Sequence, residues 1–101
     1  MNPDAKELAE RQAEICRLFG NASRILILWS LFERERPVGE IAEQVGTSLR
    51  NISQHLSLLK EHNIVIARRE GQTIYYRIVD NDWIRECPVL SNAPSKYSIK
   101  P

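Results

Sequence analysis

Residues 38–79 constrain the fold of this 101-residue chain more than any other stretch. Apolar residues recur at helical spacing over Val38–Val45, and Gly46 then interrupts the pattern. Residues 47–48 offer a turn and an N-cap, and a second helix is predicted over Leu49–Glu61. Two short helices joined by a turn of about three to four residues form the helix-turn-helix unit, whose second helix can enter a DNA major groove.

A β-hairpin is predicted directly after the second helix. Asn63 stands where a residue in the left-handed conformation commonly ends a helix. Two β-rich runs, 64–69 and 73–79, flank the loop 70–72, in which Gly71 can adopt a positive φ. Alternation of side chains in the second run predicts one buried face and one solvated face, with Tyr75 on the solvated one. Arginines close to the tip make this hairpin a candidate wing that lies along DNA phosphates.

Helices are also predicted on both sides of this unit. Residues 22–33, capped by Asn21, are apolar on nearly every side and are predicted to occupy the centre of the fold. Residues 33–37 are interpreted as a polar connection into the helix-turn-helix. After the hairpin, a short helix is predicted over residues 81–87 and ends at Pro88.

The first predicted helix, residues 5–19, carries two apolar lines. One line contains Leu8, Ile15 and Phe19, and the second, rotated by roughly a quarter turn, contains Ala5, Ala9 and Cys16. Two interpretations stay open. Either the helix packs on its own domain and also on something else, or both lines belong to one broad core face.

Length and composition indicate one small soluble domain over residues 1–90, followed by a tail over residues 91–101. No segment approaches the roughly 20 apolar residues of a membrane span, and the N-terminus lacks a signal peptide pattern. A cytoplasmic protein without a membrane partner is therefore expected. The net charge is only +1, but residues 1–46 carry two more acidic than basic side chains, whereas residues 47–79 carry three more basic than acidic ones. Positive charge thus accompanies the second helix and the hairpin, where phosphates would lie.

The helical wheel of Leu49–Glu61 turns polar side chains away from the apolar inner face. Arginine suits guanine, and asparagine or glutamine suits adenine, while a hydroxyl at the N-cap suits phosphate. His55 lies at the edge of the buried face and is interpreted as a structural or a phosphate-contacting residue. The candidates for DNA contact are Ser48, Arg50, Asn51, Gln54 and His55 on the helix, and Arg68, Arg69, Gln72 and Thr73 on the hairpin.

Several motifs together resemble those of the ArsR/SmtB family of winged-helix repressors. They are NASR at 21–24, VGEIAEQVG at 38–46, SQHL at 53–56, RREG at 68–71 and YYR at 75–77. The resemblance covers roughly residues 8–86. It implies a mainly α fold with a β-hairpin, the winged helix-turn-helix, in a homodimer built from the first and last helices. It also implies an inverted-repeat operator of double-stranded DNA as partner.

The metal sites of the family are not carried over. Metal-sensing members place two cysteines where this chain has Pro37 and Gly39. Another family site uses aspartate and histidine on the last helix, where this chain has Asp80, Asp82 and Glu86 without a histidine. Carboxylates alone make a poor site for zinc and similar metals. No metal and no cofactor are therefore predicted.

Two cysteines remain as candidate sensing residues. Cys16 lies in the first predicted helix and Cys87 in the last, the helices with which the family dimerises, so the two thiols could lie close together. They are open to three interpretations: small buried hydrophobic residues, a redox switch through a disulfide or polysulfide bridge, or ligands of a soft metalloid such as arsenite. Cys87-Pro88 also matches a weak haem-regulatory dipeptide.

Three classes of function follow from these patterns. The first is a dimeric transcriptional repressor released from DNA through its thiols, by oxidation or by an arsenite-like ligand. The second is a winged-helix protein-interaction module without sequence-specific DNA binding. The third is an enzyme, for which we find no catalytic residues, since no nucleophile–base pair, phosphate loop or metal cluster is present in the sequence.

Overall fold

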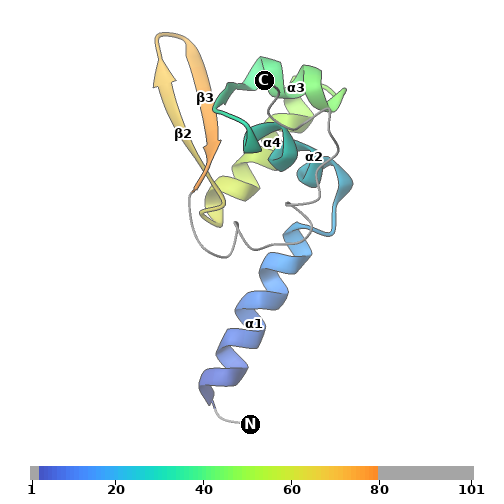
Figure 1. Ribbon diagram of the computed structural model, residues 1–101, viewed down its shortest axis with the longest axis vertical. Coiled ribbons are helices and arrows are strands. Elements are labelled where there is room, and N and C mark those ends of the chain that lie inside the picture. Colours follow the sequence, from blue (N-terminus) through green and yellow to red (C-terminus); the bar gives the residue numbers. More distant parts are fainter. Residues whose placement is uncertain (1–2, 80–101) are drawn as a thin grey trace.

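The computed structural model describes residues 3–79. The predicted helix at 81–87, Cys87 and the tail lie outside these residues. Figure 1 shows a body of short helices, a β-hairpin standing beside it, and one helix extending away from it. In chain order the elements are α1 (Pro3–Leu18), α2 (Ala22–Phe32), β1 (Arg36–Pro37), α3 (Val38–Val45), α4 (Leu49–Glu61), β2 (Val65–Glu70) and β3 (Thr73–Ile78).

The central position predicted for α2 is confirmed. The side chain of Asn21 caps the helix, since its Oδ1 accepts a hydrogen bond of 3.1 Å from the backbone N–H of Arg24. Ile27 and Leu28 are fully buried and Leu31 is nearly so. These side chains meet the inner faces of α3 and α4 in one hydrophobic core, which is completed by Leu18, Phe19, Ile41, Ala42, Ile52, Leu56, Leu59, Ile64 and Val65.

The predicted hairpin is also confirmed, with strand ends that differ from the prediction by one residue. Asn63 has φ 61° and turns the chain out of α4, and Gly71 has φ 63° at the tip. β2 and β3 pair antiparallel, with Arg68 opposite Tyr75. β3 lies in the middle of a three-stranded sheet, because β1 pairs with its other edge through the register Arg36 opposite Tyr76.

Residues 33–37 connect α2 to α3 as predicted, but the sequence did not indicate that this polar connection contains a strand residue with a buried side chain. Arg36 is 5% exposed and belongs to β1. Its guanidinium donates to the backbone carbonyl of Ser30 and pairs with Glu33 at 2.8 Å and with Glu40 at 3.3 Å. A buried charge persists only when it is paired and hydrogen-bonded, and these three partners satisfy that condition. Residues 33–37 therefore link α2 to α3 and also pair with β3.

α1 extends away from the body and touches it only near its C-terminal end (Figure 1). Leu18 and the following Phe19 are buried, and Ile15 packs against the core, whereas Leu8 is 53% exposed. The second apolar line is exposed throughout, including Cys16. Of the two interpretations of this helix, one broad core face is therefore wrong for residues 3–79, and a face remains open to something else.

No single helix among the described residues is long and apolar enough to cross a membrane. α1 and α2 meet the requirement of length and composition only as a pair, with a bend of 89° between them. α2 contributes Ile27, Leu28 and Leu31 to the hydrophobic core.

Candidate nucleic-acid interface

The turn between α3 and α4 sets the direction of the second helix. Gly46 adopts φ 80°, and its N–H bonds to the carbonyl of Ala42 at 2.8 Å, which ends α3. The hydroxyl of Ser48 then accepts a hydrogen bond of 3.1 Å from the backbone N–H of Asn51. The side-chain amide of Asn51 donates to the hydroxyl of Thr47 at 3.1 Å. The predicted turn and N-cap are thus both confirmed, and they lie on the solvent side of the molecule.

α4 is anchored on one face and open on the other. Ile52, Leu56 and Leu59 are each 0% exposed and fasten the helix to the core. Arg50 and Gln54 lie on the exposed side, together with Ser48, Asn51, Ser53 and Ser57. An exposed polar face on a rigidly packed helix is what base recognition in the major groove requires.

Leu49 is a feature of this face that the sequence analysis did not single out. It is the first residue of α4, and 53% of its surface is exposed. Its place directly after the N-cap Ser48, among polar residues, is the one sign in the sequence that it could belong to the outer face. An exposed aliphatic side chain in the first turn of a recognition helix suits the methyl group of thymine.

His55 differs from the outward residues, because it is half-buried and bound within the protein. Its Nδ1 lies 3.3 Å from Nη1 of Arg24, whose Nε donates to the carbonyl of Leu18 at 2.7 Å. A guanidinium has donors only, so Nδ1 is the acceptor and the proton of the neutral ring is on Nε2. Burial, and secondarily the positive charge of Arg24, lower the pKa of His55. This geometry favours the structural interpretation of His55 over the phosphate-contacting one.

The wing is formed by β2, β3 and the turn between them. Arg69, Gln72 and Thr73 are exposed at or beside its tip, as is Arg77 farther along β3. The hairpin that carries these side chains is anchored in the hydrophobic core by Val65, the first residue of β2, which is 2% exposed. The wing therefore presents polar side chains on a supported strand pair.

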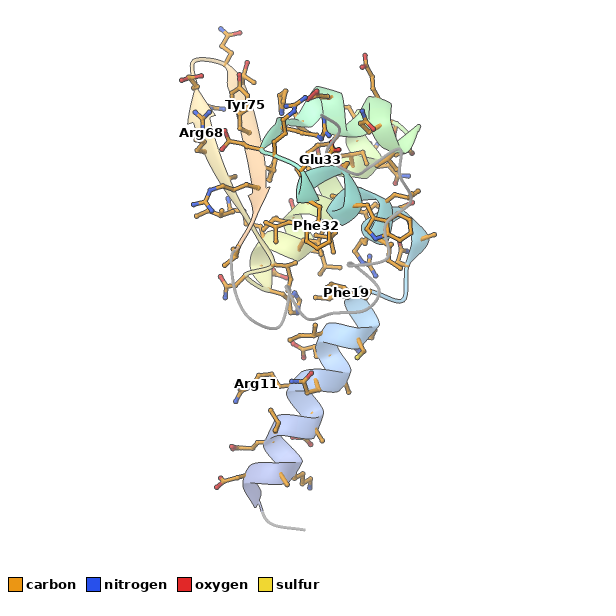
Figure 2. The ribbon with its side chains drawn as sticks, in the orientation of Figure 1. Arg11, Phe19, Phe32, Glu33, Arg68 and Tyr75 are labelled. Atoms are coloured by element: carbon orange, nitrogen blue, oxygen red, sulfur yellow. The ribbon has the colours of Figure 1, made fainter. Side chains whose placement is uncertain are left out.

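Arg68 is engaged inside the protein. Its Nε and Nη2 donate to the carboxylate of Glu35 at 2.9 and 2.7 Å, and its Nη1 lies 3.6 Å from the carboxylate of Glu70. The guanidinium carbon also lies 4.5 Å from the centre of the Tyr75 ring (Figure 2). The hydrogen bonds from Arg68 are the main reason why the pKa of Glu35 is below its ordinary value. Tyr75, which the alternation assigned to a solvated face, is accordingly half-buried.

The thiol and metal predictions concern residues that the structure covers only in part. Cys16 is exposed on α1, and its possible partner Cys87 lies outside the described residues. Within residues 3–79 no three histidine, cysteine, aspartate or glutamate side chains are grouped so that they could hold a metal ion.

Comparison with known proteins identifies the family. The family described as "Bacterial regulatory protein, arsR family" matches residues 21–67, which hold α2, α3, α4 and the start of the wing. The crystal structure of NolR from Sinorhizobium fredii is 40% identical, with a TM-score of 0.76 over 84% of this chain and 85% of that one. The chain belongs to the ArsR family. The winged helix-turn-helix predicted from its motifs is thereby confirmed.

Other relatives agree with this assignment. The transcriptional regulator KmtR of Mycobacterium tuberculosis is 44% identical over 73 residues, which are 72% of this chain and 55% of KmtR. A domain of Mb0332 from Mycobacterium bovis, described as a homodimeric winged helix-turn-helix DNA-binding domain, is 36% identical, with a TM-score of 0.69 over 77% of this chain and 72% of that one. The chain thus spans little more than half the length of KmtR. These names of regulators also agree with the prediction that this ArsR-family chain is not an enzyme.

Proposed function

We propose that this ArsR-family chain is a homodimeric, sequence-specific transcriptional repressor that binds double-stranded operator DNA. The observation that carries the proposal is the outer face of α4, which is exposed and polar while its inner face is locked in the core. Arg50, Asn51 and Gln54 read base edges in the major groove, and Leu49 contacts a thymine methyl group. Ser48 in the turn, and Arg69, Gln72 and Thr73 on the wing, contact the phosphates.

The test is fluorescence anisotropy with the protein's own upstream DNA and a scrambled duplex of equal length. Arg50→Ala and Gln54→Ala should each weaken binding to the specific duplex by roughly five- to 150-fold for each half-site, the effect of one lost base contact of about 1–3 kcal/mol in each subunit. Arg17→Ala is the charge-matched control. Arg17 is exposed on α1, so this substitution removes one positive charge at a site away from α4. Equal affinity of the wild type for both duplexes would instead favour the winged-helix protein-interaction module.

The proposed dimer uses α1 together with the last helix, which lies outside the described residues. Support comes from the exposed apolar side of α1, where Leu8 is 53% exposed, and from the likeness to a domain described as homodimeric. Charge introduced into an apolar interface destabilises it strongly. Leu8→Glu should therefore shift the chain toward monomer in sedimentation, whereas Glu10→Gln should not. Unchanged sedimentation of the Leu8→Glu variant would contradict this interface. Two half-sites in an inverted repeat follow from two-fold symmetry.

Release from DNA is proposed to act through the thiols of Cys16 and Cys87. Support comes from the exposure of Cys16 on α1, the helix assigned to the dimer interface. Loss of two electrons and two protons from the two thiols to an oxidant would form a disulfide, and the same loss with sulfur added by a sulfane-sulfur donor would form a polysulfide bridge. Either bridge would alter the packing of the terminal helices. An arsenite-like metalloid bound by the same thiolates is the alternative. Anisotropy of the wild type and of a Cys16→Ser, Cys87→Ser variant should be measured with oxidant and with arsenite. A normal response of the variant would exclude both forms of thiol sensing.

A further inference from the structure

Charged side chains of both signs share one face of the wing. Arg68 on β2 and Arg77 on β3 are basic, while Glu70 ends β2 and Glu35 precedes β1. Glu35 lies among the positive charges, since its carboxylate bonds to Arg68 and its pKa is also lowered by the charge of Arg77. The two positive charges are thus countered by two negative ones on the wing, where the sequence assigned Arg68 to DNA phosphates.

One edge of the Arg68 guanidinium, Nε and Nη2, is occupied by the carboxylate of Glu35. Two of its three nitrogens donate to Glu35, at 2.9 and 2.7 Å, and the third faces Glu70 at 3.6 Å. An arginine fork binds carboxylate and phosphate with the same two-point geometry, so the ligand now in the fork is of the kind that DNA would offer. The side chain is 48% exposed, and a phosphate can therefore approach it from solvent.

We infer that Glu35 is a specificity-setting residue, whose carboxylate takes the place of a DNA phosphate on Arg68 and so keeps the affinity of the wing for arbitrary duplexes low. The inference rests on the proposed DNA-binding function. Exposed ion pairs are individually weak, so the carboxylate reduces phosphate binding without abolishing it. Affinity that does not depend on sequence comes from phosphate contacts. When the charge of the wing is partly neutralised, the base contacts of α4 contribute a larger share of the binding free energy.

The test measures binding of the full chain to a scrambled duplex over a series of salt concentrations. Glu35→Gln should tighten this binding by about two- to fivefold. It should also steepen the slope of log affinity against log salt by about 0.9 for each subunit, or about 1.8 for the dimer, because each wing gains one phosphate contact. Glu10→Gln removes the same charge from the exposed surface of α1 and should leave the slope unchanged. Circular dichroism confirms that each variant is folded.

A double-mutant cycle shows whether the effect passes through Arg68. In an Arg68→Gln background, Glu35→Gln should no longer steepen the slope. Weaker binding of Glu35→Gln would overturn the inference, because Glu35 would then stabilise the conformation of the wing that binds DNA. An unchanged slope, or the same gain without Arg68, would overturn it as well. If the wild type binds no duplex at all, the proposed function fails first; if it binds its operator specifically and Glu35→Gln changes nothing, only this inference fails.

Discussion

Replacing Arg36 by methionine should lower the free energy of unfolding by about 2–4 kcal/mol. The arginine side chain is 6% exposed and has three partners: the carbonyl of Ser30, Glu33 at 2.8 Å and Glu40 at 3.3 Å. Methionine preserves the packing of the aliphatic stem but none of these bonds. Breaking a buried ion pair costs roughly 3–5 kcal/mol, and an orphaned buried carbonyl adds to that. The two carboxylates are 18% and 28% exposed, so water compensates for part of the loss.

Urea unfolding followed by circular dichroism measures this cost, at one protein concentration because dimerisation contributes to stability. Arg34→Met is the matched control: Arg34 pairs with Glu40 at 2.6 Å but is 56% exposed, and its loss should cost less than about 1 kcal/mol. Adding Glu33→Gln to Arg36→Met should recover stability, since it removes one unpaired charge. The reasoning is refuted if the free energy of unfolding of Arg36→Met lies within about 0.5 kcal/mol of the wild-type value, or if Arg34→Met lowers it by as much as Arg36→Met does.

Two further predictions concern local features of the fold. Because the pKa of His55 is lowered from 6.5, the folded chain binds fewer protons there than the unfolded chain, and stability should fall as the pH drops through 6.5. His55→Gln should flatten that part of the curve of urea midpoint against pH, and an unaltered curve would contradict the assignment. Gly46→Ala should cost about 1 kcal/mol because of φ 80° alone, since no atom lies within 4 Å of the added Cβ. Gly39→Ala within α3 should instead stabilise by about 0.5–1 kcal/mol, and a change of the same sign in both variants would be unexpected.

Much of the helix-turn-helix could be predicted because its signals are local. Asn21 and Ser48 cap helices through hydrogen bonds to residues three positions ahead. Gly46 and Asn63 end helices through their own backbone angles, φ 80° and φ 61°. Each of these interactions closes within one turn of the chain, so the residue types at those positions are sufficient to indicate it.

The features that were missed join residues far apart in sequence. β1 has two residues, too few for a recognisable alternation, and it exists because Arg36 and Pro37 meet β3 about 40 positions later. Glu35 and Arg68 are 33 positions apart. No local pattern indicates which carboxylate an arginine will meet, so the sequence assigned Arg68 to DNA and did not indicate that Arg36, within the connection 33–37, is buried.

The sequence by itself determined the order of the helices, the two positive-φ turns around α4, and the polar composition of its outer face. The tertiary structure alone decided that Arg36 is buried, that His55 is hydrogen-bonded to Arg24, and that the guanidinium of Arg68 binds the carboxylate of Glu35. Backbone preferences and apolar periodicity act over a few residues and can be read in order along the chain. Charge pairing and burial depend on which segments pack together, and that is defined only when the core has formed.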